Sequence, residues 1–424
     1  MYQSDQAPPE KASIPPRGSK HSRRVFWTLF VSAFCSMLGI GIIVPFLPSY
    51  ALDVGADKLF YVGLIFSAMN ISRLIFLPIM RREAESGRRD KKVILIEGLA
   101  FYIFISLGYV WAREPITLGI VRFFNGFAAA MVIPISMAII GDLTPVMGEG
   151  REMGDFQMAI MAGFGCGPLI GGALNDLAGY SAAFGTMGFL NFIALMLVIF
   201  LLPGTKKIGL GNEPPKPRKA PPYREALGSK VVIGVLIFRF INAVGRGASF
   251  SFIPILADDP KLGLSDTQVG IIITSIALVV GLFSSVAGRL ADRYSRVKMI
   301  VIGSIGFTVC ITTMPFCNSF WSLFAAAIMS GVFGAIGIPA GAALSVVEGR
   351  KYGMVTIMTL FEMAMSFGLF FGPPMGGLFG DYAGLAAAFY FAAAFNVGGT
   401  VLFYFFLRNS EANIAPNDMK INDE

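Results

Sequence analysis

The stretch GFGCGPLIGG at residues 163–172 recurs 205 positions later as GLFFGPPMGG at residues 368–377, so both copies read Gly-x-x-x-Gly-Pro-x-x-Gly-Gly. The positions that define this motif include Gly163, Gly167, Pro168, Gly171, Gly172, Gly372 and Pro373. Both copies lie in apolar segments, where glycines let two helices approach closely and a proline bends a helix. The recurrence favours a packing role that both halves of the chain share.

A similar offset relates much of the rest of the chain. Pro134 matches Pro339 at 205 positions, and Phe46 matches Phe252 at 206 positions. A steady offset over almost the whole length predicts two domains of common ancestry. Parallel six-helix halves around a site near the membrane midplane are a transporter architecture.

The composition places these domains in a membrane. Of the 424 residues, 55% are apolar and only 14% are charged, whereas soluble proteins carry about 25% charged residues. A spanning helix needs about 20 apolar residues, and we expect twelve such helices in an all-α integral membrane protein built of two pseudo-symmetric six-helix bundles. The expected spans are 25–49, 60–80, 93–111, 116–141, 154–174, 182–202, 231–256, 267–288, 298–317, 320–346, 353–379 and 385–407.

Polar segments divide the chain into five parts. The expected parts are a disordered cytosolic tail at 1–24, an N-terminal bundle at 25–203, a basic cytosolic linker at 204–230, a C-terminal bundle at 231–408 and a second cytosolic tail at 409–424. Prolines among charged residues are typical of such tails and linkers.

The basic residues are distributed unevenly between the two sides of the expected membrane. Of the 34 Lys and Arg residues, Lys58, Arg113 and Lys261 lie in the loops of one side and four lie within helices, so the other 27 lie on the side of the N-terminus. An excess of Lys and Arg marks the cytosolic side. We therefore expect a multi-pass protein of the cell membrane with both termini in the cytosol. The net charge of +7 then reflects orientation and not nucleic-acid binding.

The expected cytosolic loop at residues 288–298 reads GRLADRYSRVK. It resembles the signature loop of the major facilitator superfamily, Gly-x-x-x-Asp-Arg-x-Gly-Arg-Arg/Lys. The resemblance implies a latch that holds the cytosolic side shut, with an aspartate at a helix N-terminus and an arginine facing an acid. The residues of this latch are Gly288, Arg289, Asp292, Arg293 and Glu348. The alternative is simple anchoring by basic residues. The matching loop of the first half, MRREAESGRR at residues 80–89, lacks the first glycine.

Three further motifs resemble the twelve-helix drug:proton antiporter branch of that superfamily. Residues 38–48 read LGIGIIVPFLP, similar to its Leu-Gly-x5-Pro-x-x-Pro motif, and residues 122–126 read RFFNG, similar to its Arg-x-x-Gln-Gly motif with Asn125 in place of Gln. Residues 163–172 are similar to its antiporter motif. The resemblance implies proton-coupled export of small organic, drug-like molecules by alternating access.

Ionisable residues inside membrane helices are costly and usually functional. Glu362 lies about ten residues, or about 15 Å, into its helix, and Arg73 lies at a similar depth in a helix that the resemblance places beside it. We expect the two to pair in one conformation and separate in the other, so that Glu362 binds and releases a proton. A permanent structural bridge is the alternative. The expected proton-coupling residues are Glu362, Arg73, Arg122 and Glu97.

Cations outnumber acids inside the expected helices, which speaks against a strictly cationic cargo and permits anionic, zwitterionic or neutral solutes. The expected substrate-cavity residues are Arg246, Arg239, Asn125, Asn242 and Gln157. Two alternatives to export remain open. One is a uniporter or importer of an organic anion that uses Arg122 and Arg246 as ligands, and the other is a non-transporting membrane receptor or scaffold.

Catalysis and metal binding are not expected. The only histidine, His21, lies in the N-terminal tail, and the four cysteines lie in apolar segments without metal-ligand spacing. We expect no enzyme activity, no cofactor and no metal. The expected partners are a small-molecule substrate, protons and the lipid bilayer, and we expect the chain to act as a monomer without nucleic acid.

Overall fold

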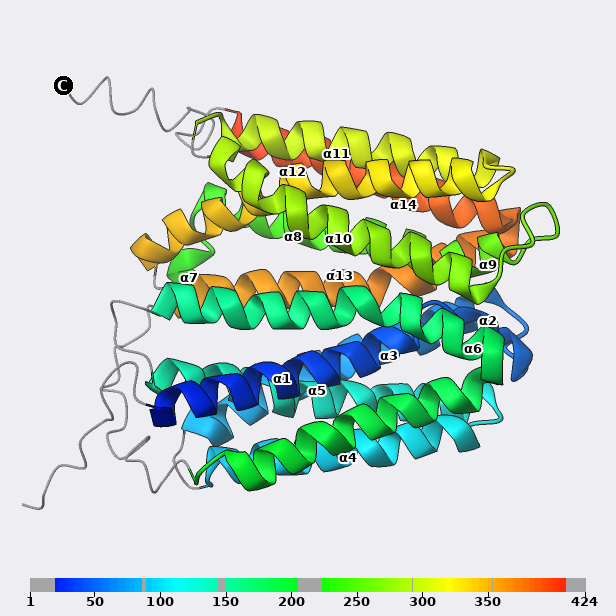
Figure 1. Ribbon diagram of the computed structural model, residues 1–424. Helices are drawn as coiled ribbons and strands as arrows, with labels where there is room; N and C mark the ends of the chain where they lie inside the picture. Colours follow the sequence, from blue (N-terminus) through cyan, green and yellow to red (C-terminus); the bar gives the residue numbers. More distant parts are fainter. Residues whose placement is uncertain are drawn as a thin grey trace, which may run out of the picture.

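The computed structural model describes residues 20–85, 89–143, 149–204, 223–291, 293–352 and 354–408. Most of the N-terminal tail, most of the basic linker, the C-terminal tail and Asp292 of the expected latch lie outside these residues. Every regular element among the described residues is a helix (Figure 1). The expected all-α class is therefore confirmed.

The helices follow one another with short connections. Their bounds are α1 (Lys20–Ile42), α2 (Leu47–Asp53), α3 (Leu59–Glu85), α4 (Lys91–Trp111), α5 (Pro115–Leu143), α6 (Glu149–Leu201), α7 (Tyr223–Ala226), α8 (Lys230–Phe250), α9 (Ile253–Ala257), α10 (Asp266–Ala291), α11 (Arg296–Thr313), the 3-10 turn η2 (Met314–Phe316), α12 (Phe320–Tyr352), α13 (Met354–Ala383) and α14 (Leu385–Leu407).

Two expected spans are broken near one end. The span expected at 25–49 is α1 followed by the short helix α2, which carries Pro48 in its first turn. The span expected at 231–256 is likewise α8 followed by α9, which carries Pro254 in its first turn. Proline has no amide hydrogen to donate to the preceding turn, so each helix ends before its proline and a new one begins.

Two glycines make sharp turns between long helices. Within α6, Gly179 has φ 76° and ψ 174°, and the element bends there, between the spans expected at 154–174 and 182–202. Gly384, which lies 205 positions later, has φ 83° and separates α13 from α14. A positive φ is accessible to glycine at little cost, so the repeat preserves the one residue type that suits the turn.

The helices run side by side between two faces of the molecule. The terminal face, where α1 begins and α14 ends, lies at the left of Figure 1, and the opposite face, with α2 and α9, lies at the right. Helices of the first half pack mainly on one another, as do those of the second half. Between the halves, α3 packs on α13, α6 on α10 and α2 on α9, whereas α1, α5, α8 and α12 make their principal contacts within their own half.

The repeated glycine motif makes the closest contacts within each half. On α6, Gly171 faces α1 so closely that a Cβ atom there would lie 1.9 Å from the carbonyl oxygen of Ile42. On α13, Gly372 faces α8, and its Cβ would lie 2.4 Å from the carbonyl oxygen of Val244. Backbone therefore packs on backbone, which is the close approach that small residues permit in membrane helices.

The last glycine of each motif faces the other half of the chain. A Cβ at Gly172 would lie 2.1 Å from the carbonyl oxygen of Asp266 on α10, and a Cβ at Gly377 would lie 2.2 Å from that of Leu59 on α3. These contacts lie near the opposite face, where the two halves touch through their backbones.

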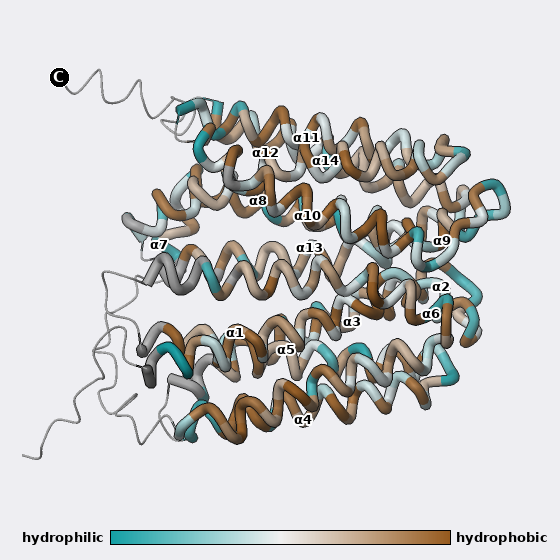
Figure 2. Tube along the Cα trace, viewed as in Figure 1, coloured by the Kyte–Doolittle hydropathy of each residue, from teal (hydrophilic) through white to brown (hydrophobic). Residues whose placement is uncertain are grey.

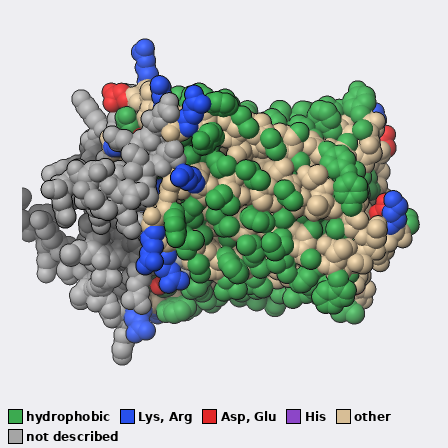
Figure 3. All heavy atoms as spheres, turned by 90° about the horizontal axis from the view of Figure 1, so that it is seen from above, with side chains coloured by type: hydrophobic (Ala, Val, Ile, Leu, Met, Phe, Trp, Pro, Cys, Tyr) green, Lys and Arg blue, Asp and Glu red, His purple; other side chains and the backbone are tan. Residues whose placement is uncertain are grey.

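The surface between the two faces is apolar. Figure 2 shows hydrophobic residues along the middle of every long helix, and Figure 3 shows Lys and Arg side chains gathered at the terminal face. Ten described stretches are long and apolar enough to cross a membrane. Outward-facing apolar side chains are strongly exposed, Phe104 at 70% and Leu282 at 71%. Soluble monomers rarely expose so large an apolar surface, so this is a multi-pass membrane protein.

Candidate functional site

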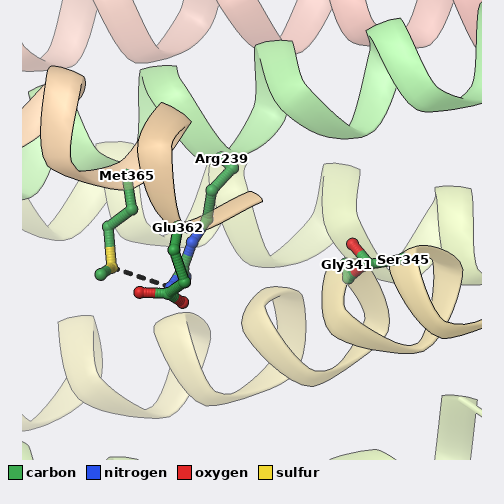
Figure 4. Close-up of polar contacts among 5 residues, drawn as sticks. All are labelled: Arg239, Gly341, Ser345, Glu362 and Met365. Atoms are coloured by element: carbon green, nitrogen blue, oxygen red, sulfur yellow. Dashed lines mark hydrogen bonds and ion pairs between the residues drawn. The ribbon is translucent and has the colours of Figure 1, made fainter. Parts of the chain in front are cut away.

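An ion pair joins α8 to α13 inside the second half. Arg239 approaches Glu362 with Nη2 3.5 Å from Oε1, and the same nitrogen lies 2.8 Å from Sδ of Met365 (Figure 4). The guanidinium also lies 4.3 Å from the ring centre of Phe361. A tight ion pair has an N···O distance of about 2.8 Å, so this pair is loose. The Glu362 side chain is 47% exposed and that of Arg239 only 13%, which leaves the carboxylate accessible.

The expected partner of Glu362 was Arg73, and the structure brings Arg239 to it instead. Among the described residues Arg73 has no acid within ion-pair distance, although its helix α3 does pack against α13. Depth explains the difference. Arg239 lies nine residues after the start of α8 and Glu362 eight residues after the start of α13, so their depths agree within about 2 Å at 1.5 Å per residue. The sequence holds this signal, since both helices begin on the same side.

A second polar cluster lies inside the first half. Arg122 is 3% exposed, and its Nη1 donates to Oη of Tyr109 at 3.5 Å. Asn125 donates to the same oxygen at 3.3 Å. The Arg122 guanidinium also lies 5.4 Å from the ring centre of Phe66. Tyr109 was not expected as a site residue; a tyrosine hydroxyl buried in an apolar helix needs a hydrogen-bond partner, which is the only sequence signal for it.

Three polar residues form a stripe along α8. Arg239, Asn242 and Arg246 are three and four residues apart, which places them on one side of the helix. Asn242 is buried, and Nε of Arg246 is buried without a hydrogen-bond partner among the described residues. The guanidinium of Arg246 lies against Gly334 of α12, where a Cβ atom would be 2.7 Å from Nη2.

The remaining interior candidates do not join these groups. Glu97 lies near the start of α4, is 41% exposed and pairs with Arg89, so it belongs to the terminal face. Gln157 lies on α6, and its side chain is outside the described residues.

Glu348, the acid of the expected latch, binds other partners in this structure. Glu348 is 3% exposed, and its carboxylate accepts a hydrogen bond from Oγ of Ser229 at 3.0 Å and pairs with Nζ of Lys351 at 3.1 Å. No arginine pairs with it among the described residues, and Arg293 is exposed. Ser229 also accepts the amide of Val232 in the first turn of α8, so Glu348 ties α12 to the start of α8. Gly288 and Arg289 lie in the last turn of α10, which ends at Ala291.

Two aspartates tie the halves together at the opposite face. The carboxylate of Asp381, at the end of α13, accepts the backbone amides of Leu59 at 2.7 Å and Phe60 at 3.0 Å. The carboxylate of Asp176, which is 205 positions earlier, accepts the amides of Asp266 at 3.1 Å and Thr267 at 2.8 Å. Each aspartate caps the first turn of a helix in the other half.

Further hydrogen bonds between the halves run from the Leu169 amide to Thr274 and from Asn175 to Asp266. Asn175 lies just before the bend of α6 at Gly179, whereas Leu169 lies ten residues before that bend. The sequence repeat contains both aspartates, but it does not show that each one reaches across to the other half.

Comparison with known proteins identifies the family. The model of the Major Facilitator Superfamily matches the chain at residues 29–244 and again at 235–421. An uncharacterised MFS-type transporter of Methanocaldococcus jannaschii is 26% identical over 388 residues, which cover 91% of this chain and 98% of the relative. The quinolone resistance protein NorA of Staphylococcus aureus is 24% identical over 383 residues, which cover 90% of this chain and 96% of NorA.

A solved structure has the same fold. A bacterial homologue of the human lysosomal transporter Spinster, in an inward-facing and unoccupied conformation, matches with a TM-score of 0.80 at 13% identity over 94% of this chain and 99% of that one. The two family matches together cover most of the chain, and its apolar helices and repeated halves agree with them. The chain therefore belongs to the major facilitator superfamily and is a membrane transporter of small molecules, not an enzyme.

Proposed function

We propose that this transporter exports small organic, drug-like molecules in exchange for protons. The observation that carries the proposal is the loose and half-exposed pair of Arg239 with Glu362. A carboxylate beside a guanidinium stays ionised, and a carboxylate that loses its cation in apolar surroundings takes up a proton. Forming and breaking this pair is therefore a means of coupling proton transfer to a change of conformation.

The architecture of the proposed transporter is twelve spans in two pseudo-symmetric bundles, residues 25–203 and 231–408. Ten described stretches qualify as spans, and one of them, Met158–Leu201, is 44 residues long. That length suffices for two crossings of about 20 residues each, and α13 supplies the twelfth. The two bundles rock against each other and expose a central site to each side in turn.

The orientation follows from charge. Figure 3 shows the basic side chains at the terminal face, and the positive-inside rule makes this face cytosolic. In this proposal the chain lies in the cell membrane as a monomer with both termini in the cytosol. In this proposal the aspartate caps close the external side, as in an inward-facing state.

The mechanism uses Arg73 as a second partner for the buried acid. Arg73 lies on α3, which packs against α13, and is 12 residues from the end of α3. Its depth therefore differs from that of Glu362 by about 6 Å. Rocking of the bundles moves the carboxylate between Arg239 and Arg73, with a proton bound during the transfer. Arg122, held by Tyr109, keeps a positive charge in the other bundle.

The cytosolic latch belongs to the other conformation. Glu348 is engaged by Lys351 and Ser229 in this state. We propose that an arginine of the 288–298 loop replaces them when the cytosolic side closes. Charge-assisted bonds of this kind are strong enough to bias the equilibrium between two conformations.

The names of relatives support a drug-like cargo. NorA is called a quinolone resistance protein, and another relative, from Bacillus subtilis, is called multidrug resistance protein 1 and is 26% identical over 382 residues. Apolar and aromatic surroundings, such as Phe361 and Met365 beside Arg239, suit an aromatic solute because methionine adapts to varied shapes.

Glu362→Gln tests the proposal. Glutamine mimics the protonated acid, so the variant in proteoliposomes should lose accumulation driven by a pH gradient while solute exchange without a gradient continues. The matched control is Glu114→Gln, an exposed acid near the opposite face, which should transport normally. A Glu362→Gln variant with wild-type dependence on the gradient would remove Glu362 as the coupling site.

A second candidate is a uniporter or importer of an organic anion. It is favoured by the side chain of Arg246, whose buried Nε has no hydrogen-bond partner among the described residues. The same proteoliposomes distinguish the two, because a uniporter equilibrates its solute without responding to a pH gradient in either variant.

A further inference from the structure

The balance of charge inside the helices leaves Arg246 unsatisfied. Glu362 lies within α13, and Arg239 pairs with it at 3.5 Å. Arg122 has the hydroxyl of Tyr109 and the ring of Phe66. The side chain of Arg246 makes no hydrogen bond, ion pair or ring contact with the described residues, and its Nε is buried. A charge inside a membrane protein without a partner is costly and marks a functional site.

The guanidinium of Arg246 packs against the backbone of α12. A Cβ atom at Gly334 would lie 2.7 Å from Nη2, so the glycine lets the guanidinium lie this close to α12. A guanidinium carries N–H donors in a fork that matches the two oxygens of a carboxylate.

The neighbouring groups on α8 extend the site. Arg239 lies seven residues before Arg246 on the same side of the helix, about 10 Å away along its axis. Its guanidinium is covered by Phe361 and Met365. The guanidinium of Arg246 and the ring and thioether beside Arg239 therefore lie along one side of α8, a cation and an apolar surface about 10 Å apart.

We infer that Arg246 and Gly334 form an anion subsite that binds the carboxylate of the transported solute. The inference rests on the proposed transport function and adds its substrate class: organic molecules with an aromatic body and a carboxylate group. The solute supplies the counter-ion that Arg246 lacks, so binding is favoured by removal of an unpaired charge as well as by new contacts.

Binding of matched acids and esters tests the subsite. The probes are naphthoic acid, pyrenebutyric acid and a quinolone carboxylic acid, each compared with its methyl ester by equilibrium dialysis against the purified protein. The wild type should bind at least one acid about tenfold more tightly than its ester, a difference of the size expected for one charged hydrogen-bonded pair. Arg246→Gln should abolish this preference, and Arg246→Lys should retain part of it because the charge remains.

Further variants separate recognition from folding. Gly334→Ala should weaken binding of the acid more than that of the ester, because its methyl group crowds the guanidinium. Arg89→Gln, a neutralised arginine on the surface, is the control and should bind as the wild type does. A purely structural Arg246 would instead lower binding of acid and ester alike.

Three results overturn the inference: equal binding of acid and ester in every pair, an acid preference that persists in Arg246→Gln, and no binding of any acid. The Glu362→Gln transport assay tests the proposed proton coupling independently of the anion subsite. It compares transport with and without a pH gradient and does not depend on the charge of the solute.

Discussion

Tyr109 provides one hydroxyl that two buried donors share. Arg122 and Asn125 both donate to its Oη, while the hydroxyl of Tyr102, about two turns away on the same face of α4, is buried without a partner among the described residues. Both tyrosines are fully buried. Residue type alone does not separate them, since each looks like an aromatic core residue in the sequence. Only the fold shows that one hydroxyl is needed and the other is not.

Tyr109→Phe should lower stability, and Tyr102→Phe should not. Removing the shared acceptor leaves the donors of Arg122 and Asn125 buried and unsatisfied, at a cost of about 1–3 kcal/mol. Removing the unpartnered hydroxyl of Tyr102 relieves a desolvated group and should be neutral or stabilising. Thermal unfolding of the two variants in the same detergent measures the difference. Equal Tm values for both would contradict the role assigned to Tyr109.

The glycine motif acts at the scale of helix pairs. Gly171 brings α6 onto α1, and Gly372 brings α13 onto α8. The repeat predicted that both copies share a packing role, because the spacing of small residues is visible in the sequence. It did not predict the breaks before Pro48 and Pro254, since an unbroken apolar run does not reveal where a proline ends a helix.

Gly171→Ala should disrupt the packing of α6 on α1. The added methyl group meets the carbonyl oxygen of Ile42 at 1.9 Å, so the backbones must separate, and overpacking of this kind costs about 1–3 kcal/mol or more. Gly185→Ala is the matched control on the same element, because its Cβ would meet nothing within 4 Å. It should be neutral or stabilising, since alanine favours helix by about 1 kcal/mol. The yield and the Tm of the folded protein measure the effect of each variant. A Gly171→Ala variant as stable as the wild type would refute the close contact.

The whole molecule is held in one conformation by contacts between its halves. Asp176 and Asp381 occupy equivalent positions of the sequence repeat. Each caps a helix of the other half at the opposite face. The repeat predicted two related halves, and it could not show this contact, because a carboxylate that caps its own helix and one that caps a neighbour's look the same in sequence. For Glu362 the structure shows a pair with Arg239, and the pair with Arg73 in the other conformation stays a prediction, because adjacency of α3 and α13 does not decide which arginine is nearer.

Removing both caps should open the opposite face. In Asp176→Asn with Asp381→Asn, the amides of the capped turns lose their charged acceptors, each worth about 1 kcal/mol, so the population shifts toward the outward-open state. Spin labels at Lys58 and Lys261, exposed on different halves, should show longer distances by pulsed electron resonance. Asp57→Asn is the control. An unchanged distance distribution in the double variant would show that the caps do not hold this face.

The central claim is that Glu362 carries a proton when it is away from Arg239 and releases it when the pair with Arg239 forms in the solute-binding state. The most direct measurement is proton release from purified, weakly buffered protein, first acidified so that Glu362 is protonated, on addition of a transported solute, followed with a pH-sensitive dye. We expect about one proton for each solute bound by the wild type, because solute binding favours the paired and ionised acid, and none for Glu362→Gln at the same occupancy. Equal release from both proteins would contradict the claim, and so would binding to the wild type without any release.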